Sequence, residues 1–475
     1  MLVRRCYDER LAQAGYLIAC QATGEAIVVD PSRNIAPYVD AARQEGVRIT
    51  RVTETHIHAD FVSGTRELAA ATGAAVLLSA EGGADWQYRY PADDVTTPLR
   101  DGNLIELGRV RFTVRHTPGH TPEHLAFIVT DTVRSDDPVA LLSGDFVFVG
   151  DVGRPDLLEV AAGIAESKEP SARALFRSLQ RLAPLPDYLQ IWPGHGAGSA
   201  CGKALGSLPT STLGYERRTN WAFQIADEDA FVAAVLEGQP PPPTYFARMK
   251  RINRDGPPIL GVRAAPAELA ASALPRALRD GLVLDIRPLQ AYAEAHIPGT
   301  LNLPLIKTFT TWAGWLLPAD RALYLIAADP GAALEAQLAL ASIGLDRVAG
   351  AFSPAVIAAA QGVPEARATR CVPMAEASRL QRDGRLIVDV RDLSEWRAGH
   401  LNGAAHHPLG TLASTLAAMD HTTPLAVHCE GGTRSAIGAS VLEWIGFSDV
   451  IDLGGGWREW ERDERRETRD VDQQR

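Results

Sequence analysis

Histidine and aspartate side chains gather in one short stretch, and three later loops contain the same kinds of residue. The stretch 56–60 holds two histidines and an aspartate directly after an apolar run. His120 follows in a Thr-Pro-Gly-His motif, Asp145 in Ser-Gly-Asp and His195 in Pro-Gly-His. Imidazole and carboxylate groups are common ligands of transition metals. We therefore predict that these four loops meet at one metal site.

A second reactive pattern is Cys429-Glu-Gly-Gly-Thr-Arg434, which follows the strand-like run 424–427 and precedes a helix pattern from Ala436. Backbone N–H groups and the dipole of that helix would face the cysteine sulfur and form an anion cradle. This environment favours the thiolate, and Arg434 would close the loop over a persulfide on Cys429. The other residues expected to contact the sulfur substrate are Glu430, Gly431, Gly432, Thr433 and Ser435.

Length and composition narrow the classes of protein to which this chain can belong. At 475 residues the chain exceeds an ordinary domain, and roughly two to four domains are expected. The net charge of −11 argues against nucleic-acid binding. No apolar run reaches the roughly 20 residues of a membrane span, and the charged start lacks a signal peptide, so we expect a cytoplasmic protein. The five cysteines are widely spread, which argues against a disulfide framework.

Patterns of apolar residues place the predicted metal ligands at strand ends. After a hairpin over 12–32, strands are predicted at 47–54, 75–78, 104–107, 110–116, 125–129 and 140–143. Helices are predicted at 35–44, from Ser63 and at 171–182. Strands followed by helices predict a layered α/β sandwich. An open sheet presents its site at the ends of its strands, which is where the ligand motifs fall.

The C-terminal part of the chain contains an internal repeat. Residues 281–287 match 384–391, and the register continues through the following segments, which predicts a duplicated α/β unit. Where the second copy has Cys429, the first copy has residues 327–332, which contain neither cysteine nor arginine. We therefore predict that the first copy is catalytically silent and acts as a spacer or docking unit.

The ordered motifs His-x-His-x-Asp, Thr-Pro-Gly-His-Thr-Pro-Glu-His, Ser-Gly-Asp and Pro-Gly-His resemble the metallo-β-lactamase superfamily over residues 1–240. Members with two zincs carry a histidine after the aspartate of the first motif, whereas this chain has Phe61. Because phenylalanine cannot ligate, the resemblance implies one metal. Held by His56, His120 and Asp145, that metal would have the two-histidine, one-carboxylate set of non-haem Fe(II) oxygen enzymes.

With that ligand set, the chain resembles the persulfide dioxygenase branch of the superfamily, in the form fused to rhodanese domains. The resemblance implies one Fe(II) per chain, bound by the three residues just named. In this family the iron uses dioxygen to oxidise the terminal sulfur of a small-thiol persulfide to sulfite. The resemblance further implies that His58, Asp60 and His195 orient the ligands or polarise the substrate.

Two more residues near these motifs are expected to take part in the reaction. Arg154 is expected to bind the anionic substrate, with a structural salt bridge as the alternative. Cys201 lies in the glycine-rich stretch 194–203, whose backbone amides could receive an anionic sulfur species. It is expected to form a persulfide or mixed disulfide beside the metal, with a simple buried cysteine as the alternative. For His116 and His124 we expect structural roles.

The Cys429 loop resembles the active loop of rhodanese sulfurtransferases. Other markers of that fold are present at residues 389–391, 399–403 and 454–457. These markers favour a rhodanese over a tyrosine phosphatase, which uses a comparable cysteine-to-arginine loop. The resemblance implies that Cys429 takes sulfane sulfur from a persulfide and passes it to sulfite, which forms thiosulfate.

The stiff segment Gln239-Pro-Pro-Pro-Pro-Thr is expected to end the first domain. The predicted fold class is α/β, a metallo-β-lactamase αββα sandwich followed by two rhodanese-like domains. The predicted parts are a dioxygenase domain at 1–240, a proline-rich linker at 241–262, an inactive rhodanese-like domain at 263–362 and an active rhodanese domain at 365–475.

The leading hypothesis is an Fe(II) persulfide dioxygenase coupled to a thiosulfate sulfurtransferase, with a role in sulfide detoxification. Its expected partners are a glutathione or coenzyme A persulfide, dioxygen, sulfite and thiosulfate, and we expect a homo-oligomer without nucleic acid or membrane. The rhodanese reaction could also run backwards and feed the iron site. One alternative is a two-zinc thioester hydrolase of the glyoxalase II kind. Another is a non-enzymatic sulfur sensor or carrier.

Overall fold

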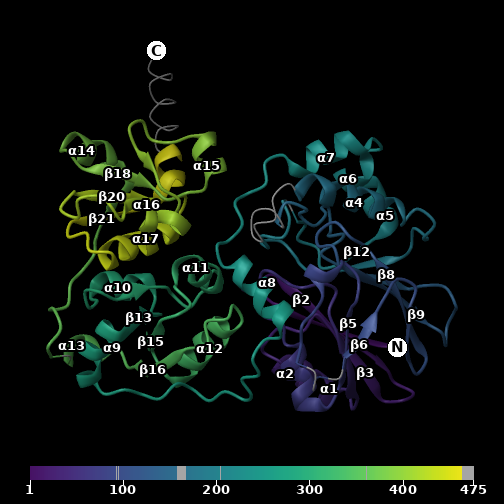
Figure 1. Cartoon of the computed structure of the whole chain (residues 1–475). Coiled ribbons are helices and arrows are strands. Elements are labelled where there is room, and N and C mark those ends of the chain that lie inside the picture. The colour runs from purple at the N-terminus through teal and green to yellow at the C-terminus, as the bar shows by residue number, and fades with distance from the viewer. Residues whose placement is uncertain (92–93, 95, 158–166, 204, 360, 463–475) are drawn as a thin grey trace. The chain divides into compact units, whose positions relative to one another are not determined.

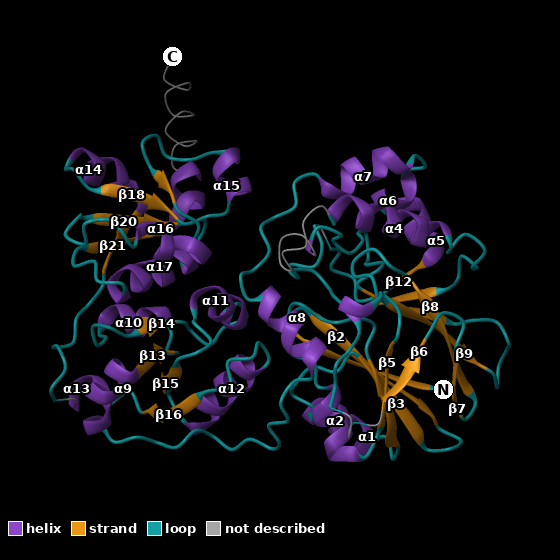
Figure 2. Ribbon diagram, viewed as in Figure 1, coloured by secondary structure: helices purple, strands orange, loops and turns teal. Residues whose placement is uncertain are grey.

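The computed structural model describes the whole chain except residues 92–93, 95, 158–166, 204, 360 and 463–475. It forms two compact units, one of Met1–Arg263 with Ala341–Gly344 and one of Ala264–Leu340 with Leu345–Arg475. In each unit, strands lie together in sheets and helices pack on the faces of the sheets (Figures 1 and 2). Among the described residues, no helix is long and apolar enough to cross a bilayer.

Two six-stranded sheets form the first unit. The first sheet has the order β1-β2-β3-β4-β5-β6, with strands at Leu2–Asp8, Gln13–Cys20, Glu25–Val29, Arg48–Thr53, Ala75–Ser79 and Thr96–Leu99. The second sheet has the order β12-β11-β10-β9-β8-β7. Its strands, from β7 to β12, are Leu104–Leu107, Val110–His116, Leu125–Asp131, Ala140–Gly144, Gln190–Pro193 and Ser211–Thr212.

The core of the first unit lies between its two sheets, and helices cover both outer faces. In β2, Tyr16 and Ile18 belong to the central core, whereas Leu17 and Ala19 pack with the helices, because successive strand residues face opposite sides. The helices on the first sheet are α1 (Ala36–Gln44) and α2 (Thr65–Thr72). Those beside the second sheet are α4 (Lys168–Gln180), α5 (Leu213–Thr219), α6 (Trp221–Gln224) and α7 (Glu228–Leu236). The predicted αββα sandwich is confirmed.

The segment 241–262, expected to be a linker, belongs instead to the first unit. It contains the helix α8 (Phe246–Asp255), in which Phe246, Met249 and Asn253 are buried. Met249 and Asn253 lie three and seven residues after Phe246, so the three side chains form one stripe along the helix. Burial of this stripe packs the segment into the unit, which the neighbouring prolines alone did not indicate.

The second unit contains two parallel sheets, each joined by helical connections. The first sheet has the order β14-β13-β15-β16, and its strands from β13 to β16 are Gly281–Asp285, Leu301–Asn302, Ala322–Ile326 and Val348–Phe352. Its helices from α9 to α13 are Leu274–Asp280, Leu289–Glu294, Phe309–Leu316, Pro330–Ala341 and Val356–Ala359. The second sheet has the order β17-β21-β20-β18-β19, and its strands from β17 to β21 are Arg370–Pro373, Leu386–Asp389, Ala405–His406, Leu425–His428 and Val450–Gly454. Its helices from α14 to α17 are Ala377–Arg382, Leu393–Ala398, Leu412–Leu416 and Thr433–Trp444.

The strand orders of these two sheets agree with the internal repeat. The order β14-β13-β15-β16 is repeated as β19-β18-β20-β21, and β17 adds one strand beside β21. The two loops that the sequence aligns, residues 327–332 and the loop at Cys429, follow the corresponding strands β15 and β20. The duplication therefore extends to topology. The rhodanese-like identity of the first copy stays a prediction.

Candidate metal centre and cysteine loop

The predicted metal ligands come from loops at the ends of neighbouring strands. His56 follows β4, His120 lies between β8 and β9, Asp145 follows β10, and His195 follows β11. Strands β8 to β11 are neighbours in one sheet, while β4 belongs to the facing sheet. Loops from the two sheets thus meet at one edge of the sandwich, as a site at strand ends requires.

His56, His120 and Asp145 form a compact and fully buried group. One carboxylate oxygen of Asp145, Oδ2, lies 3.5 Å from His120 Nε2 and 3.9 Å from His56 Nε2. The candidate ligand atoms of the three residues all lie within 4.8 Å of one another. This spacing and donor set fit one metal ion with open coordination positions.

Hydrogen bonds on the far ring nitrogens turn both imidazoles toward Asp145. His56 Nδ1 lies 3.0 Å from Thr55 Oγ1, and His120 Nδ1 lies 3.1 Å from the carbonyl oxygen of Arg154. Burial, and then the neighbouring histidines, hold the pKa of His56 well below its usual value, and burial also lowers the pKa of His120. Both rings are therefore neutral, which is the form that ligates a metal.

Several buried atoms of this group have no hydrogen-bond partner among the described residues. They are His56 Nε2 and both carboxylate oxygens of Asp145. Buried polar atoms without a partner carry a desolvation cost of about 1–3 kcal/mol each, which a bound cation would remove. The residues present therefore fit the metal that the sequence motifs imply.

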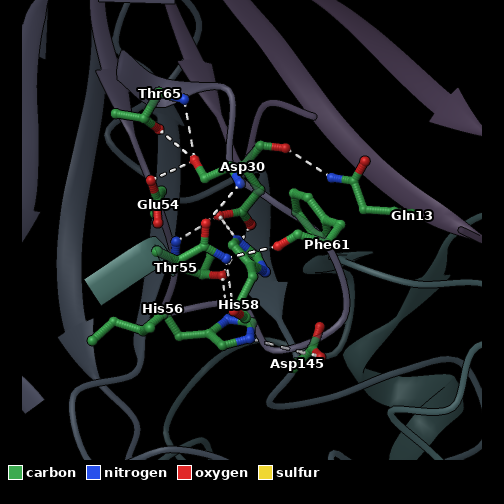
Figure 3. A network of polar contacts seen from close by, with 12 residues as sticks. Gln13, Asp30, Glu54, Thr55, His56, His58, Phe61, Thr65 and Asp145 are labelled. Atoms are coloured by element: carbon green, nitrogen blue, oxygen red, sulfur yellow. Dashed lines mark hydrogen bonds and ion pairs between the residues drawn. The ribbon is translucent and has the colours of Figure 1, made fainter. Parts of the chain in front are cut away.

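A polar network anchored on Asp30 supports the loop that carries His56 (Figure 3). The Asp30 carboxylate accepts hydrogen bonds from the N–H of Thr55 at 2.6 Å and from its hydroxyl at 2.9 Å. It also lies 3.1 Å from His58 Nε2. Burial alone would lower the pKa of His58, but the Asp30 carboxylate raises it to about 9. His58 is thus a buried cation paired with Asp30 beside the metal ligands.

Phe61 and Asn253 fix the end of the same loop. Phe61 is fully buried, and its ring centroid lies 4.4 Å from that of His58. The side-chain amide of Asn253, from α8, donates to the carbonyl oxygens of His58 and Phe61, both at 2.7 Å, and accepts from the N–H of Ser63 at 2.9 Å. Figure 3 shows Phe61 beside His58 in this network.

Asp60, His195 and Cys201 form a second buried group next to the first. Their candidate ligand atoms also lie within 4.8 Å of one another. His195 Nε2 is 3.3 Å from Asp60 Oδ2 and 3.5 Å from Asp145 Oδ1, so the two groups adjoin. Burial and the nearby carboxylates raise the pKa of Cys201 well above its usual value. In this environment the free side chain is a thiol, which does not favour a role as a nucleophile.

Arg154 is placed differently from the expectation that it binds substrate. Its guanidinium group is 1% exposed and forms a paired interaction with Asp156, at 3.0 and 2.7 Å. It also donates to the carbonyl oxygens of Ala200 and Pro240. These contacts tie the Cys201 loop and the proline segment to the loop that carries Asp145, and the substrate-binding role of Arg154 stays a prediction. The alternative of a structural salt bridge fits them.

Two important residues were missed in the sequence. Asp30 ends a short apolar strand before a proline, and its φ of 51° marks a conformation that is uncommon for a non-glycine residue. A charged residue at that strand end was a usable signal. Asn253 lies on α8, and no local pattern distinguishes it from a surface asparagine.

The cysteine loop has the geometry expected of an anion cradle. Cys429 follows β20, and the N–H of Gly432 at the start of α17 donates to its sulfur at 3.1 Å. The N–H of Trp457 donates to the Cys429 carbonyl oxygen at 2.7 Å. A side chain at Gly456 would lie 2.6 Å from that same carbonyl oxygen, so the turn at 454–457 can close on the loop only with glycine there.

The charged residues of the loop pair with groups outside it. Arg434 forms a double hydrogen bond with Glu395, both contacts at 2.6 Å. Glu430 lies 3.3 Å from Arg391 and 3.0 Å from Arg458. Ser435 donates from its hydroxyl to the carbonyl oxygen of Gly432 at 3.0 Å. These contacts fix the charged side chains around the loop, and Arg434 is close enough to Cys429 to interact with it electrostatically.

The first copy of the repeat contacts the helix that begins at the cysteine loop. The N–H of Asn302, in β14, donates to Ser440 Oγ of α17 at 3.2 Å. His296 Nε2 lies 3.3 Å from the carboxyl group of Glu443 at the end of the same helix. The loop 327–332 begins α12 without a cysteine or arginine, so it cannot form a cysteinyl persulfide. The first copy therefore supports α17 from one side.

Comparisons with known proteins agree with the two parts of the chain. Residues 9–195 match the model of the metallo-beta-lactamase superfamily, and residues 374–463 match that of the rhodanese-like domain. A crystal structure of a metallo-beta-lactamase from Staphylococcus aureus subsp. aureus COL is 41% identical, with a TM-score of 0.67, and covers 74% of this chain and 99% of its own.

Among curated proteins, the chain is similar to hydroxyacylglutathione hydrolases. The protein of Cereibacter sphaeroides (strain ATCC 17029 / ATH 2.4.9) is 30% identical over 258 residues, which is 54% of this chain and 85% of that protein. The protein of Rhodospirillum rubrum is 33% identical over 180 residues, or 38% of this chain. The matched part spans 60% of the length of the Rhodospirillum rubrum protein.

Proposed function

The chain belongs to the metallo-beta-lactamase superfamily and carries a C-terminal rhodanese-like domain, and from this premise we propose that it is a non-haem Fe(II) persulfide dioxygenase coupled to a sulfurtransferase. The observation that carries the proposal is the buried group of two neutral histidines and one carboxylate, whose ligand atoms lack partners among the described residues. This donor set, with Phe61 in place of a further imidazole, favours one iron over two zincs.

The proposed first reaction consumes one persulfide, one dioxygen and one water. It yields the free thiol, sulfite and two protons, so that dioxygen is reduced while the terminal sulfur is oxidised. Bound Fe(II) would supply open positions for dioxygen and for the terminal sulfur. The chain would contribute His56, His120 and Asp145 as ligands, and the cation of His58, held by Asp30, would attract the anionic substrate.

The proposed second reaction takes place at Cys429. Its sulfur attacks the terminal sulfur of a second persulfide, the bond between the two sulfurs of that substrate breaks, and the small thiol leaves. Sulfite then attacks the outer sulfur of the Cys429 persulfide, which forms thiosulfate and restores the thiolate. The Gly432 N–H, 3.1 Å from the sulfur, would stabilise the anionic sulfur in both steps. One chain that contains both sites raises the effective concentration of sulfite at Cys429.

A second candidate function is hydrolysis of a glutathione thioester by a two-zinc site. The curated relatives named hydroxyacylglutathione hydrolase favour it. In that reaction a metal-bound water would attack the thioester. The absence of an imidazole at Phe61 and the fused rhodanese-like domain favour the dioxygenase instead.

Dioxygen uptake separates the two candidates. The metal-free chain is loaded with Fe(II) without oxygen, and glutathione persulfide is then added in air-saturated buffer. We expect dioxygen consumption with sulfite or thiosulfate as products, and no hydrolysis of a glutathione thioester. A zinc-loaded sample is the control and should consume no dioxygen. Thioester hydrolysis by the zinc form, with no dioxygen uptake by the iron form, would establish the hydrolase.

A further inference from the structure

The turn at the end of α12 belongs to the first unit, although the chain on both sides of it belongs to the second. Ala341–Gly344 falls in the first unit, whereas Ala264–Leu340 and Leu345–Arg475 form the second. In the sequence this turn joins α12 to β16, which are elements of the first copy of the repeat. The equivalent turn of the second copy, Trp444-Ile445-Gly446 at the end of α17, lies in the second unit. The first copy therefore contributes a segment to the first unit, and the second copy does not.

Two backbone hydrogen bonds give this turn the shape of a common helix ending. The N–H of Leu345 donates to the carbonyl oxygen of Leu340, and the N–H of Gly344 donates to that of Ala341, both at 3.0 Å. Gly344 has a φ of 71°, the left-handed conformation that such an ending requires and that favours glycine. The equivalent turn is closed by the same two bonds, with Gly446 in the position of Gly344. The turn is thus a feature of the repeat, and the two copies differ in what the turn contacts.

The last carbonyl groups of α12 bind side chains of the first unit. A helix leaves these carbonyl groups without partners inside the helix. The carbonyl oxygen of Ala341 accepts from the Arg33 guanidinium at 3.0 Å, and that of Ile343 accepts from the Arg248 guanidinium at 2.9 Å. Arg33 follows β3, and Arg248 lies on α8. Two positive groups therefore face the negative end of the helix dipole, where positive charge is stabilising.

A third carbonyl group binds the loop that carries His56. The carbonyl oxygen of Ser342 accepts from the N–H of Val62 at 2.7 Å, and both residues are buried. Val62 directly follows Phe61, whose carbonyl oxygen accepts from Asn253 of α8. The loop is thus held by α8 at its carbonyl groups and by the end of α12 at an N–H group. Because the bond to Val62 is buried, its loss would leave two polar groups unpaired.

We propose that the turn 341–344 is a positioning element of the metal site, and that the first copy of the repeat serves that site by supplying it. A side chain at Gly344 would lie 3.0 Å from Met249 Cε and 3.6 Å from Val62 Cγ2, so the turn fits closely against α8 and the loop. The position of His56 depends on the course of that loop. The first copy lacks the cysteine and arginine that sulfur transfer needs, and this turn gives it a different role. The proposal rests on the metal ligands proposed above and not on the reaction of the metal.

Amide hydrogen exchange tests this role without a metal or a substrate. The full-length chain is freed of metal, and exchange is followed by mass spectrometry in peptides that cover residues 56–63. Gly344→Ala strains the turn, because the added methyl group meets Met249 and the backbone is left-handed. We expect exchange of residues 56–63 to accelerate at least about tenfold in this variant. Gly446→Ala is the matched control, since it places the same strain at the equivalent turn, and it should leave this exchange as in the wild type.

Arg248→Met removes one donor from the turn and covers the case in which Gly344→Ala fails to fold. It should also accelerate exchange of residues 56–63. In a titration against a chelator, it should weaken Co²⁺ binding at least about tenfold, because the loop with His56 loses its fixed position. Arg217→Met is its control and should change neither measurement. Arg217 also donates to carbonyl oxygens just beyond a helix, those of Leu182 and Leu185 after α4.

Unchanged exchange of residues 56–63 in both Gly344→Ala and Arg248→Met would overturn the proposal, and so would an equal acceleration in Gly446→Ala. The exchange experiment requires neither metal nor dioxygen, so failure of this role and failure of the proposed function are distinguishable. Faster exchange in the two variants of a chain that consumes no dioxygen would support the role of the turn and refute the dioxygenase. Dioxygen uptake by the wild type, with a loop that neither variant loosens, would support the dioxygenase and refute the role of the turn.

Discussion

Asp145 lies between the two buried groups of candidate ligands. Its Oδ2 faces His56 and His120, and its Oδ1 faces His195. Both oxygens are buried and have no hydrogen-bond partner among the described residues. A neutral side chain of the same shape would fill the space but remove the charge that attracts a cation.

Asp145→Asn is therefore expected to lose metal while it keeps the fold. Iron affinity should fall at least about tenfold, which corresponds to about 1.4 kcal/mol. Dioxygen uptake with persulfide should fall at least in proportion. Iron content after dialysis is the direct measurement. Asp136→Asn, at an exposed position, is the control and should bind iron as the wild type does. Full iron content in Asp145→Asn would refute the ligand assignment.

Arg154 illustrates how a charged residue in a functional motif can serve the fold. Its pair with Asp156 is buried, so removal of one partner leaves an uncompensated charge. Arg154→Met should lower the free energy of unfolding by about 3–5 kcal/mol, measured by urea titration. Arg173→Met removes a surface arginine paired with Glu169, Glu228 and Asp229, and it should shift the urea midpoint much less than Arg154→Met. Unchanged stability with a raised KM for the persulfide would instead restore the substrate-binding role.

Helix α8 acts on the metal loop through one side chain. The Asn253 side chain donates hydrogen bonds to the carbonyl oxygens of His58 and Phe61. The helix itself is held by its buried stripe, so the asparagine transmits the position of α8 to the loop that carries His56.

Asn253→Ala should lower the free energy of unfolding by about 1–3 kcal/mol, because it leaves buried polar groups unpaired. It should also weaken iron binding, because the loop loses its fixed position. Asn220→Ala is a matched control. Asn220 is equally buried and makes a similar set of hydrogen bonds, to Asp151, Glu216 and Ala222, none of which lies in the loop that carries His56. Equal loss of iron affinity in the two variants would contradict a specific role for α8.

The end of α17 contains a titratable contact with the first copy of the repeat. Burial raises the pKa of Glu443 from 4.5 to about 7 and lowers the pKa of His296. The other groups that act on this pair are Tyr292, Arg367, Thr369, Asp285 and Arg287. His296 Nδ1 donates to the carbonyl oxygen of Tyr292, which leaves Nε2, 3.3 Å from the Glu443 carboxyl group, as an acceptor for a protonated Glu443.

This contact should make stability depend on pH. Because the folded pKa of Glu443 lies above its unfolded value, its contribution is fully present below about pH 4.5 and is lost as pH rises through about 7. The full span of that change is about 3 kcal/mol. Glu443→Gln keeps a donor but does not titrate, so its urea midpoint should fall less than that of the wild type between about pH 5 and about pH 8. Parallel pH profiles of the two proteins would show that Glu443 is ionised in the fold throughout.

At the scale of the whole molecule, the metal site and Cys429 are expected to use the same persulfide substrate. Cys429→Ser removes the proposed sulfur acceptor and leaves the metal ligands untouched. Dioxygen uptake should be unchanged, while the product should change from thiosulfate to sulfite. Cys371→Ser, at an exposed cysteine outside the cradle, should give the wild-type product ratio. Ion chromatography of the products provides the measurement, and unchanged thiosulfate output in Cys429→Ser would refute the role of Cys429.

Local patterns predicted much of the fold. The hairpin expected at 12–32 is present as β2 and β3, and the helix expected at 35–44 is present at Ala36–Gln44. Both follow from periodicities that a few consecutive residues carry. The segment 241–262 was misjudged because its prolines outweighed the buried stripe of α8, in which Asn253 contacts residues nearly two hundred positions earlier in the chain.

By itself, the sequence singled out His56, His120 and Asp145 as candidate ligands and the Cys429 loop as a candidate reactive site. Each lies in a short motif at a strand end, where residue type and spacing already carry the chemistry. Only the tertiary structure decided the partners of Arg154, the support that Asn253 gives, and the meeting of Cys201 with Asp60 and His195. The physical reason is that these contacts join separate loops, and loops that are distant in sequence come together only when both sheets are packed. Phe61 shows the difference most clearly. The sequence shows that this position lacks an imidazole, whereas only the fold shows that Cys201 lies beside the remaining candidate ligands.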